Sequence, residues 1–175
     1  MTEAEVIASI VHREGGWSDH PDDRGGPTKY GITVATLGRW RKYGRNATRS
    51  ELRTLTSQEA GEIYHAEYIT RPGFAQIAFE PLRVQCVDFG VNSGPPRAIR
   101  WLQRVCSCTP VDGVLGAVTA RHVNALPGRL VNDALVAARL RLLEDFMASD
   151  PRQETFRRGW TTRALSFVLA ASDGG

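Results

Sequence analysis

Four acidic residues within ten positions near the N-terminus could supply a catalytic pair of carboxylates. The first, Glu14, follows Ile7 and Ile10 at helical spacing, so the three side chains are predicted to share one face of a helix. A carboxyl group beside that apolar face would be partly desolvated, which favours the neutral, proton-bearing form that a general acid needs. The turn-rich loop that follows carries the other three carboxylates, Asp19, Asp22 and Asp23.

Two carboxyl groups facing each other across a glycosidic bond are the arrangement that glycosidases use. Inverting enzymes hold the groups ~6.5–9.5 Å apart with a water between them, and retaining enzymes hold them ~5–5.5 Å apart. A hairpin that folds back over the helix end could deliver one of the aspartates, and a hydroxyl such as that of Thr28, to this gap. A capped helix followed by a polar surface turn explains the same pattern, so spacing alone leaves both interpretations open.

A helix and a β-hairpin are needed to position these groups, and the rest of the sequence predicts a mainly α fold. Thr2 and Glu5 form a capping-box pattern before the first helix, and Gly15 and Gly16 offer its C-cap. Residues 17–33 are rich in turn formers and are predicted to form a small β-hairpin. Further helices are predicted over residues 33–43, 56–69, 81–91, 96–105, 130–147 and 156–170, with a short one ending near residue 126.

Composition and charge place the chain among globular proteins with anionic partners. Its 175 residues suit one compact domain, or one domain with a small lobe, and no apolar run approaches the ~20 residues of a membrane span. The start of the chain is acidic and lacks the basic region of a signal peptide. Residues 91–175 carry 11 Lys and Arg against 7 Asp and Glu, a net +4, whereas residues 1–90 carry −1. The C-terminal half is therefore expected to favour anionic partners.

No metal or cofactor is expected. A C-x-C pattern without a second Cys/His pair is poor evidence for zinc, so Cys86, Cys106 and Cys108 are predicted to be buried or idle thiols. The D-H-P-D-D stretch at 19–23 matches no calcium-loop spacing. The basic C-terminal half contains no recognisable nucleic-acid-binding motif, so no nucleic-acid partner is expected either.

Four blocks of sequence, in order, resemble the muramidases of glycoside hydrolase family 108, which are found among phage and prophage endolysins. The first two blocks are E-G-G-x6-D-x-G-G-x-T-x-x-G-I-T at 14–33 and I-Y-H-A-E-Y-I-T-R-P-G-F at 63–74. The third is D-F-G-V-N-S-G-P-P-R-A-I-R-W-L-Q-R at 88–104, followed by V-D-G-V-L-G, and the fourth is F-R-R-G-W-T-T-R at 156–163. The later blocks are similar to a peptidoglycan-binding region of such proteins, so the resemblance covers nearly the whole chain.

This resemblance implies a lysozyme-like fold, mostly helical, with a small β-hairpin edging the cleft. Residues 1–90 would form the muramidase catalytic region, and residues 91–175 a peptidoglycan-binding-like helical region packed into the same globular domain. The implied reaction is hydrolysis of the β-1,4 bond between N-acetylmuramic acid and N-acetylglucosamine in bacterial peptidoglycan. Glu14 falls on the family's acid, Asp23 on its second carboxylate, and Thr28 on the hydroxyl that holds the attacking water.

Aromatic and amide side chains near this region are candidates for sugar binding. The candidates are Trp17, Tyr30 and Tyr68 for stacking and Asn92 for a hydrogen bond. Packing or a turn hydrogen bond explains each of them equally well. Trp101 and Trp160 lie in apolar helix patterns and are predicted to belong to the core.

Two alternatives come from other functional classes. A muramidase-like module could only bind peptidoglycan or a partner protein, but the presence of Glu14, Asp23 and Thr28 argues against binding alone. A lytic transglycosylase uses a similar glutamate without adding water, and Asp23 and Thr28 argue against that activity. The protein is expected to be a monomer without stable membrane insertion. It would remain in the host bacterial cytoplasm until the membrane is permeabilised and then act on the cell wall.

Overall fold

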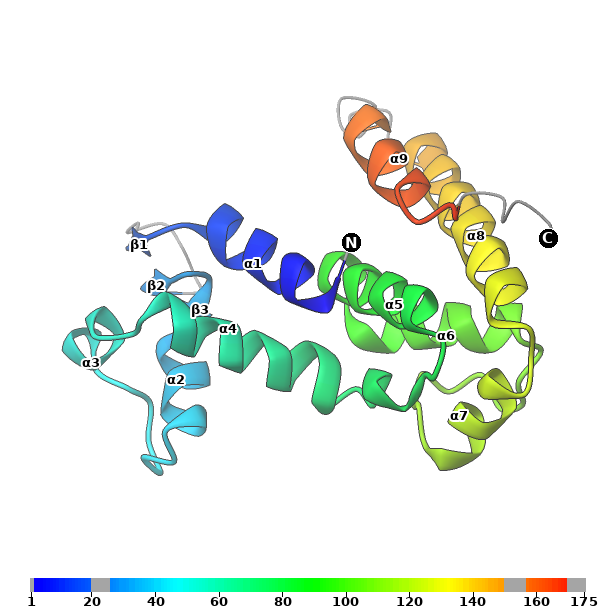
Figure 1. Cartoon of the computed structure of the whole chain (residues 1–175). Helices are drawn as coiled ribbons and strands as arrows, with labels where there is room; N and C mark the ends of the chain where they lie inside the picture. The colour runs from blue at the N-terminus through cyan, green and yellow to red at the C-terminus, as the bar shows by residue number, and fades with distance from the viewer. Residues whose placement is uncertain (1, 20–25, 150–156, 170–175) are drawn as a thin grey trace. The chain divides into compact units, whose positions relative to one another are not determined.

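The computed structural model describes residues 2–19, 26–149 and 157–169, which divide into two compact units. The N-terminal unit spans Thr2–Ile69, and the C-terminal unit begins at Thr70. Helices dominate both, which confirms the prediction of a mainly α fold with a small β element (Figure 1). In chain order the elements are α1 (Glu3–Glu14), β1 (Trp17–Ser18), β2 (Thr28–Lys29), β3 (Ile32–Thr33), α2 (Val34–Trp40), α3 (Arg49–Arg53), α4 (Ser57–His65), η1 (Ala66–Thr70), η2 (Phe74–Gln76), α5 (Glu80–Ser93), α6 (Pro95–Val105), α7 (Ala117–Asn124), α8 (Gly128–Ser149) and α9 (Arg157–Leu165).

In the N-terminal unit, α1 packs against α4 through the apolar face that its spacing predicted. The helix begins at the predicted capping box, where the Thr2 hydroxyl accepts a hydrogen bond from the Glu5 N–H and the Glu5 carboxylate accepts one from the Thr2 N–H. Its buried residues are Val6, Ile7 and Ile10. Removing this stripe from water is the main stabilising contribution of the helix pair, at ~25 cal/mol per Å² of apolar surface.

The predicted hairpin is a three-stranded antiparallel sheet in the order β1-β2-β3. Ser18 and Thr28 pair between the first two strands, and Lys29 pairs with Ile32 across the second hairpin. The two residues that join β2 to β3 have positive φ angles, 52° at Tyr30 and 72° at Gly31. Two such residues are what a type I′ turn needs to match the twist of a hairpin.

Three local departures from the predicted helices occur in this unit. The helix α3 was not predicted, although Thr48 and Glu51 form a capping box around its start. The predicted helix over 33–43 ends at Trp40, because Lys42 and Gly44 adopt positive φ angles. The predicted helix over 56–69 is α-helical only to His65 and continues as the π-helical turn η1.

The C-terminal unit is built around α5. Residues 84–90 of this helix are all buried, and it packs against α6, α8 and η2. Figure 1 shows α9 lying alongside α8, the 22-residue helix that also packs against α6. The three cysteines are buried free thiols. Trp101 and Trp160 are only half-buried, so the prediction that both belong to the core is wrong.

Candidate active site

Glu14 is the last residue of α1, where Gly15 caps the helix with a φ of 65°. Its side chain is 44% exposed, whereas Ile7 and Ile10 are buried. Glu14 lies on the side of α1 that faces Tyr64 of α4, but it is more exposed than the apolar residues of that face. The helix ends at Glu14 and the chain turns away toward β1, so no further helical turn covers the carboxylate.

The turn between β2 and β3 lies directly against the Glu14 carboxyl group. The Tyr30 N–H donates to the Gly15 carbonyl at 3.0 Å, which fixes the turn to the end of α1. A Cβ atom added at Gly31 would lie 3.1 Å from Oε2 of Glu14 and 2.5 Å from the Tyr64 hydroxyl. Only glycine fits there, and the carboxylate, the phenol and the turn backbone form one cluster.

Tyr64 joins α4 to this cluster. Its hydroxyl donates to the Tyr30 carbonyl at 2.9 Å, and its ring stacks on that of Tyr68, with centroids 5.7 Å apart. Burial raises the pKa of Tyr64, and the charge of Glu14 raises it further. Burial also raises the pKa of Tyr68, followed by the charges of Glu67 and Glu14. Both phenols therefore stay protonated at neutral pH and can donate hydrogen bonds.

Tyr64 was not predicted as a site residue. Its spacing of four from Tyr68, on the helix that packs against α1, was the available signal, because residues at i and i+4 share one face. Tyr30, Tyr68 and Glu14, which were predicted, lie around it in the structure.

The sheet carries two further predicted residues. Thr28 is half-buried and opens β2, paired with Ser18 on one side and Thr33 on the other. Trp17 in β1 is half-buried, and the Arg53 guanidinium lies 4.1 Å from its ring centroid. This cation–π contact occupies part of the indole surface that a sugar could use.

Of the three loop aspartates, only Asp19 can be located. Its carboxylate pairs with Arg49 at 3.0 Å, so it already has a cationic partner. Asp22 and Asp23 lie outside the described residues.

Asn92 belongs to the C-terminal unit. Its amide donates to the main-chain carbonyl of Asp88 at 2.7 Å, a hydrogen bond within α5. Within the part of the chain that the structure describes, no group of three or more His, Cys, Asp or Glu side chains could hold a metal ion. None of the helices described there is long and apolar enough to cross a membrane.

Comparison with known proteins gives two family matches that divide the chain. Residues 7–94 match the family model described as glycosyl hydrolase 108, and residues 97–165 match a predicted peptidoglycan domain. The solved structure of SagA from Brucella abortus is similar, at 32% sequence identity and a TM-score of 0.66, with 97% of each chain covered. Among curated proteins, the chain has no match.

Proposed function

This chain belongs to the glycosyl hydrolase 108 family, and we propose that it hydrolyses the β-1,4 bond between N-acetylmuramic acid and N-acetylglucosamine with Glu14 as the general acid. The two family matches support a muramidase-type function on peptidoglycan. The observation that carries the role of Glu14 is its carboxylate, open to solvent at the helix end and held beside the Tyr30–Gly31 turn.

In this proposal the exposure of Glu14 serves the reaction. An open carboxyl group can reach the glycosidic oxygen, and a bound glycan strand would cover it and displace water. The substrate would thus provide the desolvation that favours the neutral acid. Tyr64 acts as a positioning residue, because its hydrogen bond to Tyr30 holds the turn that limits where the carboxylate can lie.

We assign the second half of the mechanism to Asp23 and Thr28. Asp23 would activate water or stabilise the oxocarbenium-like transition state, and Thr28 would hold the water. A water held between two carboxyl groups favours inversion of configuration. The position of Thr28 at the start of β2, two residues before Tyr30, supports its assignment, since the same strand leads to the turn beside Glu14.

Sugar contacts are assigned to the aromatic residues of the same unit. Tyr68 stacks on Tyr64, and Tyr30 forms the turn beside Glu14, so both border the proposed reaction centre. Trp17 would stack a more distant sugar on the ring surface that Arg53 leaves free. Asn92 remains a candidate for a hydrogen bond to the substrate.

Mass spectrometry of purified peptidoglycan digested by the wild type and by Glu14→Gln tests the proposal. Glutamine keeps the shape of the side chain, but its amide cannot transfer a proton to the leaving oxygen, so turnover is expected to fall by about 10²–10⁴-fold. Products with reducing muramic ends and one added water per cut are expected from the wild type. Anhydro ends would indicate a transglycosylase, and equal product from both proteins would remove Glu14 from the mechanism.

We further propose an endolysin role, in which the enzyme acts on the wall after the membrane is permeabilised. The same pair of proteins, expressed inside bacteria with and without a membrane-permeabilising protein, extends the test. Lysis is expected only from the wild type and only with the permeabilising protein. Lysis by the wild type alone would contradict the need for permeabilisation.

A further inference from the structure

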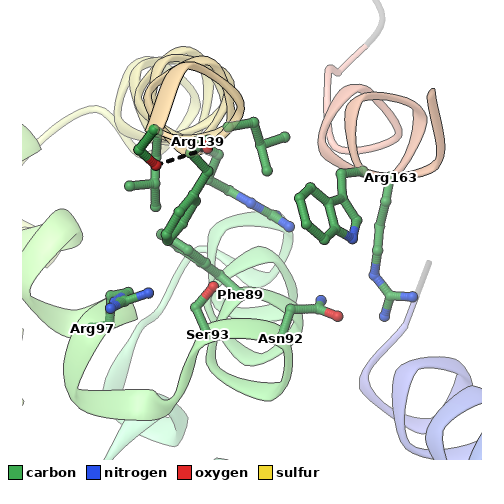
Figure 2. Close-up of a pocket in the computed structure, with 11 residues that line it drawn as sticks. Phe89, Asn92, Ser93, Arg97, Arg139 and Arg163 are labelled. Atoms are coloured by element: carbon green, nitrogen blue, oxygen red, sulfur yellow. Dashed lines mark hydrogen bonds between the residues drawn. The ribbon is translucent and has the colours of Figure 1, made fainter. Parts of the chain in front are cut away.

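The C-terminal unit contains a cavity of about 410 Å³ that the proposed hydrolysis does not use. Its lining comes from α5, α6, α8 and α9. Figure 2 shows Arg139 and Arg163 extending from α8 and α9 toward the end of α5 that carries Asn92 and Ser93, with Arg97 on the other side. No acidic side chain lines the cavity among the residues that the structure describes.

Asp88 lies behind this cavity and neutralises only part of its charge. Its side chain is fully buried in α5, where Oδ2 accepts from Nη2 of Arg139 at 2.7 Å and Oδ1 accepts from Nε of Arg163 at 2.6 Å. One carboxylate therefore serves two guanidinium groups. With Arg97, the described lining retains two more positive charges than Asp88 can balance.

Arg139 is the buried member of the set and has an unused donor. Its side chain is 7% exposed, and Nη1 makes no hydrogen bond to the described residues. The guanidinium lies 5.0 Å from the Phe89 ring centroid and 5.3 Å from that of Phe167, which hold it in place. A buried donor without an acceptor costs free energy, so an acceptor that enters the cavity would be favoured.

The rest of the cavity lining is mostly apolar, with Ser149 from α8 as a further polar residue. Leu142, Leu143 and Phe146 line it from α8, and Trp160 lines it from α9. A volume of this size with apolar walls and a few convergent polar groups is typical of a site for a small ligand.

Nη1 of Arg139 and the exposed guanidinium of Arg97 can each donate a charge-assisted hydrogen bond to an anionic oxygen. Asp88 already uses the other donors of Arg139 and Arg163 named above. The chemistry therefore selects a carboxylate attached to a short apolar group.

We propose that this cavity binds the carboxylate-bearing stem peptides of peptidoglycan, an inference that rests on the proposed function. In peptidoglycan the lactyl carboxyl group of each substituted muramic acid forms an amide with a stem peptide, so the glycan strand itself carries no charge at these positions. The stem peptides supply the carboxylates, and alanine residues supply methyl groups next to them. Ser93 and Asn92 offer hydrogen-bonding groups for the peptide backbone at the edge of the same cavity.

The probe is a free stem pentapeptide of alanine, glutamate, a diamino acid and two alanines, titrated into the isotope-labelled full chain by NMR. This peptide has no glycosidic bond, so hydrolysis cannot interfere. Saturable shifts of the Arg139 Nε–H and Trp160 indole resonances are expected. The same peptide with every carboxylate amidated is expected to bind at least about fivefold more weakly. The proposal would be overturned if both peptides bound equally well or if neither bound. It would also be overturned if glycerol phosphate shifted these resonances and the peptide did not.

Arg97→Gln supplies the variant, because Arg97 is exposed and its loss leaves the buried ion pairs intact. A weakening of about fivefold for the peptide is expected. Arg104→Gln is the matched control, because Arg104 is exposed on the same helix but does not line the cavity. The Arg104 guanidinium lies 5.0 Å from the Trp101 ring centroid, much as that of Arg97 lies 5.5 Å from the Phe146 ring centroid. Equal weakening by both variants would assign the effect to overall charge and overturn the site.

Failure of this inference is distinguishable from failure of the proposed function. Release of reducing ends without peptide binding would remove the cavity site and leave the hydrolase. Peptide binding without release of reducing ends would leave the cavity site and remove the hydrolase.

Discussion

At the scale of single residues, a side chain at position 31 would collide with the Tyr64 hydroxyl and crowd the Glu14 carboxyl group. The Tyr64 hydroxyl is held by its hydrogen bond to Tyr30, and Glu14 is held by the end of α1. Of these neighbours, the Glu14 carboxyl group is the more exposed and the freer to move. A methyl group at position 31 would lie 2.5 Å from the Tyr64 hydroxyl, which must shift, and 3.1 Å from Oε2 of Glu14, which must give way only slightly.

We predict that Gly31→Ala lowers turnover of peptidoglycan by about 10²-fold, because moving the Tyr64 hydroxyl breaks the hydrogen bond that holds the turn and lets the Glu14 carboxyl group move from its place. Gly44→Ala is the matched control, since Gly44 has a φ of 69° but nothing within 4 Å of an added Cβ. The strained φ angle should lower the free energy of unfolding by about 1 kcal/mol in both variants, and the contact with Tyr64 should lower it further in Gly31→Ala. Equal turnover of the two variants in a reducing-end assay would show that Gly31 does not position Glu14.

The helix-end position of Glu14 could be predicted from the i, i+3, i+7 spacing and the two glycines that follow. The exposure of its side chain could not be predicted. Periodicity shows which face of the helix a residue lies on, but it does not show how far the neighbouring elements extend over that face. The contact of Tyr64 with Tyr30 joins residues 34 positions apart. A hydrogen bond over that distance depends on the tertiary fold, which local patterns do not contain.

At the scale of elements, Arg41 ties the end of α2 to the first turn of α4. Its Nε donates to Oε1 of Glu59 at 2.8 Å and its Nη2 to Oε2 at 2.6 Å. This bidentate pair, with both side chains about one-fifth exposed, lowers the pKa of Glu59 and raises that of Arg41. The ionised glutamate is therefore favoured in the folded state.

The sign of the pH effect follows from the lowered pKa of Glu59. The folded state binds fewer protons than the unfolded state, so the stabilisation is present above the ordinary pKa of about 4.5 and is lost as the pH falls below it. We predict that Glu59→Gln lowers the free energy of unfolding by about 1 kcal/mol at neutral pH. The free energy of unfolding of this variant should also decrease less than that of the wild type as the pH falls. Urea unfolding of both proteins at neutral and acid pH measures the difference. Glu62→Gln, on the same helix, should keep the wild-type profile, and parallel profiles for all three would contradict the prediction.

Elements with strong hydrophobic periodicity could be predicted, and short or irregular ones could not. The helix α3 has five residues, too few to show a hydrophobic period, although its capping box was visible. The π-helical turn η1 differs from an α-helix only in its hydrogen-bond pattern, and the sequence of this segment predicts a helix without showing which kind. Such turns occur often at functional sites, and this one carries Tyr68.

At the scale of the whole molecule, the four sequence blocks indicated the family, but not the cavity. Arg97, Arg139 and Arg163 lie on three helices and meet only after α5, α6, α8 and α9 have packed. The division of the chain at residue 90 into catalytic and wall-binding regions stays a prediction. The excess of positive charge in residues 91–175 could be counted from the sequence, and it predicts how salt affects binding of the intact protein to the cell wall.

A net +4 over residues 91–175 should attract the carboxylate-rich wall over distances longer than a contact. Salt screens such attraction, since the Debye length falls from about 10 Å at 0.1 M to about 3 Å at 1 M. We predict that sedimentation of Glu14→Gln with purified peptidoglycan decreases several-fold over about this range of salt, because the variant binds the wall without digesting it. Peptidoglycan whose carboxylates have been amidated is the control and should show weak binding with little salt dependence. Binding that is unchanged by salt on untreated peptidoglycan would mean that neutral contacts to the glycan, made in the N-terminal unit, dominate the attachment.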